Sequence, residues 1–446
     1  MNEREDTVTS RPAALARAGR LGVLRPLGNR DFALLWTGLT VSLLGDGIYL
    51  VAIAWQVYEL SNAPTALSVV GIAWTLPTLI FLLVGGVLSD RFDRRRLMVA
   101  SDLIRGVAIA AIGVLAVMDT LELWHLLGLV AVYGAGEALF APAFQAIVPD
   151  IVPQDHLVQA NSLDMLMRPL GAQLAGPALG GVLVAGIGAG GAFLLDAASF
   201  GVSAACLLAM RPRPLALTDS SAGRSALREV GEGFRFVCAH TWLWGTLLAA
   251  AIFLLVSFGP QQVLLAFVVK NDLGGTAGDF GLVLAAAGLG AIGVAIAMGQ
   301  WQVPRRHITF MYVAWALASL PIVVWGIATE LWQLMLASVV RGAGTTAGMV
   351  VWMTLMQTRV PRGLLGRVSS LDWLVSIGLI PVSFALTGPI AEAFGARETL
   401  VGAGVLGAAV TLAFLFLPGM RDTERVTDRN DSTSWSAAST SIERNE

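Results

Sequence analysis

Charged residues are scarce in this chain: Asp, Glu, Lys and Arg make up only 13% of its 446 residues, whereas a soluble domain carries about 25%. Cysteine and histidine are also rare, at two and four residues, so we expect neither a disulfide nor a metal site. No glycine-rich loop precedes a Lys-Ser or Lys-Thr pair, which disfavours ATP as the energy source. No catalytic constellation or nucleic-acid-binding pattern is visible, so we expect no enzyme and no cofactor.

Apolar residues, at 56%, are what the sequence has in excess. They gather in continuous stretches, each long enough to cross a bilayer as a helix. Continuous rather than alternating patterns disfavour membrane strands. The sequence therefore predicts an all-α integral membrane protein with twelve transmembrane helices. The stretches lie at about 32–57, 66–88, 97–118, 123–147, 162–185, 190–210, 242–268, 278–299, 308–327, 331–355, 369–392 and 398–418.

The arginines indicate the orientation of these helices. Loops on one predicted side hold nearly all of them, whereas the other side has only Lys270 and Arg397. Cytoplasmic loops carry the excess of basic residues, so we expect both termini in the cytoplasm. Arginine far exceeds lysine, and alanine and glycine are abundant, which is typical of a GC-rich bacterial genome. We therefore expect a multi-pass protein of the bacterial inner (plasma) membrane.

The two halves of the chain resemble each other. YGAG at 133–136 matches RGAG at 341–344, and NSLD at 161–164 matches SSLD at 369–372, both at an offset of 208 residues. A shared offset indicates duplication of a six-span unit. The expected domains are a cytoplasmic segment (1–30), a six-helix bundle (31–210), a cytoplasmic linker with an amphipathic helix (211–241), a second bundle (242–418) and a disordered cytoplasmic tail (419–446).

The string GVLSDRFDRRRL at 86–97 resembles the loop between the second and third spans of the major facilitator superfamily, G-x-L-x-D-R-x-G-R-R/K. Asp93 replaces the second glycine of that pattern. LGDGIYLVAIAW at 44–55 and VPDIVPQDHLVQANSL at 148–163 are similar to its twelve-span drug-exporter branch, which includes macrolide, tetracycline-type and siderophore exporters. The resemblance covers about 30–420 and implies two pseudo-symmetric six-helix bundles that work by alternating access.

In that family the loop acid lies against the start of the eleventh span, where unpaired N–H groups attract it. The resemblance implies that Asp90 near Ser369 and Ser370 holds the inner side shut, although the loop could also serve only to set topology. Other charged residues near inner helix ends are expected to form gate pairs between helices. The predicted inner gate comprises Asp90, Arg91, Arg94, Arg95, Asp102, Arg105, Asp164, Arg168 and Asp372.

The string GAQLAGPALGG at 171–181 resembles the family's exporter motif, G-P-x-x-G-G, which accompanies antiport. Its glycines would let a neighbouring helix approach closely, and its proline would bend the span. General small-residue packing is the alternative. The motif residues are Gly171, Gly176, Pro177, Gly180 and Gly181.

Charged side chains in the middle of a span are costly, which makes them functional candidates. Asp46 and Glu137 could bind and release a proton, and Arg341 could pair with one of them or with substrate. A structural polar contact is the alternative for each. An adaptable apolar cavity would suit varied ligands, although lipid-facing packing would explain each of its residues singly. Its candidates are Phe140, Phe144, Gln145, Phe258, Gln261, Gln262, Trp352, Met353 and Met356.

The sequence thus predicts a proton-coupled, monomeric exporter of small amphiphilic molecules such as a drug, an antibiotic or a siderophore. Its expected partners are the substrate, protons and membrane lipid. An importer or symporter of the same fold is one alternative. A membrane sensor or partner-binding protein without transport is the other.

Overall fold

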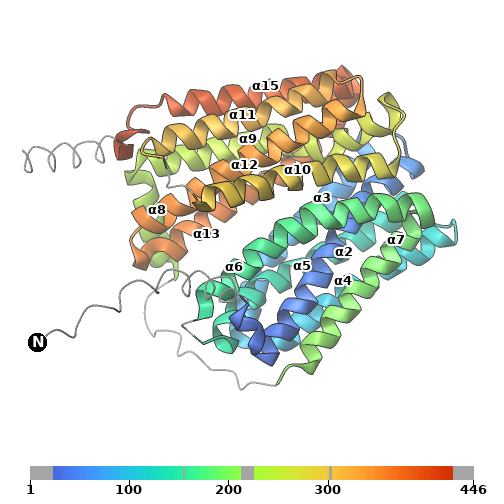
Figure 1. The fold of residues 1–446 in the computed structure, drawn as a ribbon, viewed down its shortest axis with the longest axis horizontal. Coiled ribbons are helices and arrows are strands. Elements are labelled where there is room, and N and C mark those ends of the chain that lie inside the picture. The colour runs from blue at the N-terminus through green and yellow to red at the C-terminus, as the bar shows by residue number, and fades with distance from the viewer. Residues whose placement is uncertain (1–23, 154–155, 212–225, 301–303, 425–446) are drawn as a thin grey trace, which may run out of the picture.

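The computed structural model describes residues 24–153, 156–211, 226–300 and 304–424, and within these ranges it has helices and no strand. Figure 1 shows two helical bundles, the first coloured blue to green and the second yellow-green to red. Residues 1–23 of the expected N-terminal segment, 212–225 of the expected linker and 425–446 of the expected tail lie outside this description.

The helices follow the predicted apolar stretches. The first bundle contains η1 (Arg25–Gly28), α2 (Arg30–Leu60), α3 (Pro64–Arg91), α4 (Arg94–Val117), α5 (Leu123–Ile151), α6 (Leu157–Arg168), η3 (Pro169–Ala175) and α7 (Gly176–Ala209). The second contains α8 (Ala226–Ala239), α9 (Thr241–Phe267), η4 (Val268–Asp272), α10 (Ala277–Gln300), α11 (His307–Ile327), α12 (Leu331–Arg359), α13 (Arg362–Gly378), α14 (Ile380–Phe394) and α15 (Ala396–Leu415).

Eleven described segments are long and apolar enough to cross a membrane. The longest, Gln159–Ala209, has 51 residues. As one straight helix it would be about 76 Å long, more than twice the roughly 30 Å hydrocarbon core. It breaks at Gly188, whose φ of 75° and ψ of 169° are not helical. We interpret this segment as two spans, which gives the twelve that the sequence predicts.

Contacts with α2 show that the chain reverses at Gly188. Before Gly188, residues further along the segment contact residues further along α2, so the two run parallel. After Gly188, residues further along the segment contact earlier residues of α2, so the two run antiparallel. The pairs are Gly171 with Leu43 and Gly180 with Ile48 before the break, and Asp196 with Gly45 and Cys206 with Gly38 after it. The segment is therefore a hairpin of two antiparallel spans.

Helices α5 and α12 show the internal repeat most clearly. Both have 29 residues, and each boundary of α12 lies 208 residues after the matching boundary of α5. Both begin with a capping box, formed by Glu122 with His125 and by Glu330 with Gln333. Equal boundaries and equal caps support the duplication that the shared offset predicts.

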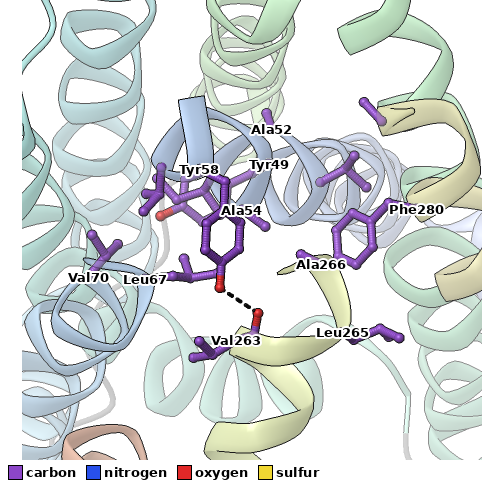
Figure 2. Close-up of a cluster of buried hydrophobic side chains, with 14 of the residues drawn as sticks. Tyr49, Ala52, Ala54, Tyr58, Leu67, Val70, Val263, Leu265, Ala266 and Phe280 are labelled. Carbon is purple, nitrogen blue, oxygen red and sulfur yellow. Dashed lines mark hydrogen bonds between the residues drawn. The ribbon is translucent and has the colours of Figure 1, made fainter. Parts of the chain in front are cut away.

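The bundles are fastened to each other at the end opposite Arg30 of α2 and Leu415 of α15, here called the distal end. One hydrophobic cluster crosses both bundles there, with Tyr58 from α2 and Val263 from α9 among its members. Figure 2 shows the Tyr58 hydroxyl donating a hydrogen bond to the carbonyl oxygen of Val263 at 2.8 Å. The Thr65 hydroxyl also donates to a carboxylate oxygen of Glu392 at 2.7 Å. Apolar packing and hydrogen bonds thus join the bundles at this end.

Toward the end that holds the start of α2 and the end of α15, called the terminal end, each bundle has its own hydrophobic cluster. One surrounds Met98 and Leu163 in the first bundle, and the other surrounds Leu243 and Tyr312 in the second. The two bundles therefore share a core at the distal end and have separate cores toward the terminal end.

Helix α8 of the linker lies against α13 and α9. Its Glu232 and Arg367 of α13 form an ion pair at 2.6 Å. Phe234 is 59% exposed while Val237 is buried, which fits the amphipathic helix that the sequence predicts. The side chains of Leu227 and Val230, on the same helix, lie outside the described part.

Candidate functional site

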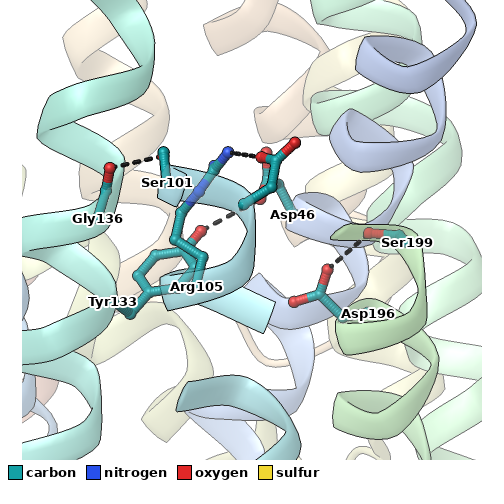
Figure 3. A network of polar contacts seen from close by, with 8 residues as sticks. Asp46, Ser101, Arg105, Tyr133, Gly136, Asp196 and Ser199 are labelled. Atoms are coloured by element: carbon teal, nitrogen blue, oxygen red, sulfur yellow. Dashed lines mark hydrogen bonds and ion pairs between the residues drawn. The ribbon is translucent and has the colours of Figure 1, made fainter. Parts of the chain in front are cut away.

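A polar network lies inside the first bundle, where α2, α4 and α5 meet (Figure 3). Nη2 of Arg105 and Oδ1 of Asp102 are 2.6 Å apart, and the exposed fractions of these side chains are 5% and 0%. The Tyr133 hydroxyl donates to Oδ1 of Asp46 at 3.1 Å. Arg105 also attracts Asp46 electrostatically. The network thus joins a predicted coupling residue, Asp46, to two residues that the sequence assigns to the inner gate.

Aromatic rings hold the Arg105 guanidinium in place. Its Cζ lies 4.5 Å from the ring centroid of Phe200 and 4.8 Å from that of Phe140, both within cation–π range. Asp102 and Arg105 are on one helix, so they do not form the pair between two helices that the sequence predicts. Because α4 begins at Arg94, Asp102 is already about two turns inside the bundle.

Glu137, the second predicted coupling acid, has a different partner. Its Oε2 accepts a hydrogen bond from Nε1 of Trp74 at 2.7 Å, which ties α5 to α3. The side chain is half-buried, and Arg105 attracts it as well. Asp46 and Glu137 therefore share the field of one guanidinium although they lie on different helices.

Asp196 is an acid to which the sequence analysis gives no role. It is fully buried on α7, where its Oδ1 accepts a hydrogen bond from the Ser199 hydroxyl at 3.3 Å. Its Oδ2 has no hydrogen-bond partner among the described residues, and it interacts electrostatically with Asp46. Its position inside an apolar stretch was the signal that could have identified it. The described residues contain no group of three or more His, Cys, Asp or Glu that could hold a metal ion.

Arg341, the third predicted coupling residue, lies in the second bundle. Its guanidinium donates to the side-chain oxygen of Gln261 on α9 and to the carbonyl oxygen of Ala318 on α11, the latter at 3.3 Å. Its Cζ is 5.6 Å from the ring centroid of Trp325. These partners are neutral, so the expected pairing with Asp46 or Glu137 is not what its described contacts show.

Two arginines of the predicted inner gate bind elements of their own bundle. Arg94 forms an ion pair with Asp150 near the end of α5. Arg95 donates to the carbonyl oxygen of Leu208 near the end of α7, at 2.9 Å. These contacts tie the start of α4 to two neighbouring helices within the first bundle.

Asp93, which replaces a glycine of the family pattern, caps helix α4. Its Oδ1 accepts a hydrogen bond from the backbone N–H of Arg96 at 3.2 Å. Its φ of −56° lies in a region open to any residue, so no glycine is needed here. Asp90 and Arg91 form the end of α3, but their side chains lie outside the described residues.

The other gate acids occupy equivalent positions in the two halves. Asp164 and Arg168 form an ion pair at 2.9 Å on α6. Asp372, 208 residues after Asp164, accepts hydrogen bonds from Trp352 at 3.1 Å and from Ser376 at 3.4 Å. Each of these contacts stays within its own bundle, so they do not join the halves in this state.

The predicted exporter motif lies in contact with both bundles. Cβ on Gly176 would come within 2.7 Å of the Gly47 Cα on α2, and Cβ on Gly180 within 2.9 Å of the Ile48 Cα. Cβ on Gly181 would meet the Gly278 Cα of α10 at 3.0 Å. Gly171 also packs on α2, and the carbonyl oxygen of Pro177 would be 2.4 Å from Cβ on Gly281 of α10. These glycines thus allow the close approach that the motif predicts.

The predicted cavity residues do not form one surface. Phe144, Trp352 and Met356 are buried in the separate clusters toward the terminal end, because their helices pack these side chains into their own bundle. Phe140 packs on Arg105 instead. The remaining side chains are half-buried or exposed: Gln145, Phe258, Gln261, Gln262 and Met353.

Comparisons with known proteins place this arrangement in a family. The family model described as "Transmembrane secretion effector" matches residues 21–444. The multidrug efflux pump Tap of Mycolicibacterium fortuitum is 28% identical over 411 residues, 87% of this chain and 96% of that protein. Macrolide efflux protein A of Streptococcus pyogenes is 21% identical over 377 residues, 84% of this chain and 93% of that protein.

A solved structure shares the fold. The bacterial homologue of the iron transporter ferroportin in its inward-facing state aligns with a TM-score of 0.63 at 14% identity. The alignment covers 87% of this chain and 99% of that chain. The chain therefore belongs to the transmembrane secretion effector family of the major facilitator superfamily, and it is a membrane transporter rather than an enzyme.

Proposed function

We propose that this transporter exports small amphiphilic molecules from a bacterial cell in exchange for protons. The observation that carries the proposal is the buried network of the first bundle, in which Asp46 bonds Tyr133 and shares Arg105 with Asp102. Arg105 forms its ion pair with Asp102 and attracts Asp46 without a direct contact among the described interactions. A second carboxyl in the same interior is stable when it holds a proton or faces a cation. Asp46 is therefore suited to take up a proton in one state and release it in another.

The contact between the two bundles at the distal end supports one direction of transport. The arginine distribution favours a cytoplasmic terminal end, so the closed distal end would face outward. Substrate would enter between the bundles from the cytoplasm in the present state. Opening of the distal end would then release substrate outside and give protons access to Asp46 and Glu137. The efflux pumps among its relatives support export over import.

The inner gate would form in the opposite state, when the terminal end closes. Asp90, in the last turn of α3, would then meet the start of α13, whose first N–H groups attract an anion. That helix begins at Arg362, so Ser369 and Ser370 lie about two turns inside it and not at the helix start that the sequence predicts. Asp90→Asn is expected to slow transport without changing the direction of coupling. Transport at the wild-type rate would leave the loop with a role in topology alone.

Transport in everted membrane vesicles tests the proposal. An imposed pH gradient should drive accumulation of at least one amphiphilic probe by the wild type, with ethidium, erythromycin and 1-naphthylacetate tested in parallel. Asp46→Asn and Glu137→Gln should abolish this gradient-driven accumulation, while Arg96→Gln, at a side chain that is 88% exposed, should retain it. Full gradient-driven transport by both acid variants would remove these carboxyls from coupling.

The same vesicles separate the alternatives. Probe movement only in the opposite direction, with protons, would indicate an importer or symporter. Absence of any substrate-dependent flux, together with a protein that copurifies with the chain, would indicate a sensor or partner-binding function.

A further inference from the structure

Among the described residues, only neutral groups contact Arg341 in the second bundle. Gln261 and the carbonyl oxygen of Ala318 accept two of its N–H donors, and the Trp325 ring lies 5.6 Å from its Cζ. A guanidinium has five N–H donors in a rigid fork, so others stay available. A cation inside the membrane region is costly without a countercharge. The neutral contacts fix its position but leave its charge without a balancing anion.

Two further donors beside Arg341 have no hydrogen-bond partner among the described residues. They are Nε1 of Trp325, whose side chain is 3% exposed, and the hydroxyl of Ser338, which is 1% exposed. Buried polar groups in native proteins are nearly always paired, so two such donors near one cation form an unusual group. An indole N–H can only donate, so its partner must be an acceptor.

The packing of α11 on α12 brings these donors to the same region. Arg341 bonds Ala318, and Gly344 packs on Ala314, so the two helices run antiparallel. Ser338 is one turn before Arg341 on α12, and it therefore lies at a level between Ala318 and Trp325. The Trp325 ring thus faces the Arg341 guanidinium across the two helices, and Ser338 lies one turn from Arg341 at the same level as this pair.

This group lies close to the junction of the bundles. Gln261, which accepts from Arg341, lies two residues before Val263 on α9. The carbonyl oxygen of Val263 accepts a hydrogen bond from Tyr58 of the first bundle (Figure 2). The Arg341 side chain is half-buried rather than sealed. A molecule between the bundles would therefore reach the guanidinium just on the terminal side of the distal fastening.

We propose that Arg341, Trp325 and Ser338 bind an anionic oxygen of the transported molecule, of the kind found in a carboxylate. This inference rests on the proposed function, because it names the chemical class of a compound that the chain would carry. An anionic amphiphile supplies both the missing countercharge and the acceptors for the two unpaired donors. Gln261 positions the guanidinium for that contact.

Thermal unfolding of the purified full-length chain in dodecyl maltoside tests the site with matched probes. The probes are 1-naphthylacetate and its neutral isostere 1-naphthylacetamide. Saturating carboxylate should raise the Tm of the wild type by about 2 °C or more, and the amide should not. Arg341→Gln should remove this shift, whereas Arg96→Gln, at an exposed arginine of the first bundle, should keep it.

Two readouts separate binding from a structural role. Arg341→Gln without ligand should have a Tm equal to or above that of the wild type, because it removes an uncompensated cation. Trp325→Phe keeps the ring but loses the N–H donor, so its carboxylate shift should be smaller than that of the wild type.

Several results would overturn the site. Equal shifts with carboxylate and amide, no shift with either, or a full carboxylate shift in Arg341→Gln would each do so. A Tm of Arg341→Gln that falls and recovers when Glu137→Gln is added would make Glu137 the partner instead. Export of ethidium and of 1-naphthylacetate by the wild type is measured separately in vesicles, and absence of both would overturn the proposed function while leaving the binding result in force.

Discussion

The two bundles share a backbone plan and differ in their polar interiors. Tyr133 and Arg341 stand at equivalent positions, 208 residues apart, on helices with matching boundaries. Each donates to a side chain on the first membrane helix of its bundle, Tyr133 to Asp46 and Arg341 to Gln261. Among the described residues, the first interior groups several carboxyls around Arg105, while the second holds Arg341 among neutral groups. Duplication thus kept the scaffold, while the two interiors came to differ in charge, which the proposed division into a proton site and a substrate site would require.

The largest expected difference in stability between the bundles appears when the interior arginine of each is replaced by glutamine. Arg105→Gln should lower the free energy of unfolding by about 3–5 kcal/mol, because it leaves Asp102 buried without its partner. Arg341→Gln should cause no such loss, since its described partners are neutral. Thermal unfolding of both variants in detergent measures the difference.

The pair Asp102→Asn and Arg105→Gln serves as the control for that comparison. If the loss in Arg105→Gln comes from an uncompensated carboxylate, the double variant should recover much of the wild-type Tm. Equal Tm values for Arg105→Gln and Arg341→Gln would mean that the two interiors do not differ in charge compensation.

A smaller effect is expected at the close helix contact of the first bundle. Gly176→Ala would place a Cβ 2.6 Å from the carbonyl oxygen of Gly171 and 2.7 Å from the Cα of Gly47. These are backbone atoms, so the helices must separate, at a cost of about 1–3 kcal/mol.

Gly186→Ala is the matched control on the same helix, since no atom lies within 4 Å of its added Cβ. That variant should be neutral or more stable by up to about 1 kcal/mol. Unfolding of the two variants in one detergent compares them directly, and equal stabilities would show that α2 and α7 can separate freely.

The helices and their number could be predicted from the sequence because apolar length dominates the structure of a membrane protein. The continuous helical segment around Gly188 shows where that signal is strongest: its length already requires two spans. The repeat could be recognised from Asp164 and Asp372, because equivalent helical positions in the two halves hold the same acid. The glycines at 176 and 181 were predictable as sites of close approach, since few other residues permit it.

Side-chain partners could not be predicted in the same way. Asp102 and Arg105 look like residues of an inner helix end, yet the rise of α4 carries them into the interior of the bundle. Trp352 looks like a cavity residue, yet it is buried and donates to Asp372. Asp93 stands where the family pattern has a glycine, yet its side chain caps helix α4. Each outcome depends on which face of a helix packs against its neighbour. A continuous apolar sequence has no pattern that identifies this face.

The smallest expected effect should be equal in the two bundles. Glu122 and Glu330 cap α5 and α12 through the same box at exposed positions. Loss of such a cap costs about 1 kcal/mol, so Glu122→Ala and Glu330→Ala should lower the Tm by similar amounts. The sites are at opposite bundles, so the double variant should show the sum of the single effects within about 0.5 kcal/mol. Unequal or strongly non-additive losses in the same unfolding assay would mean that the duplicated scaffold has itself diverged, and that the difference between the bundles extends beyond their polar interiors.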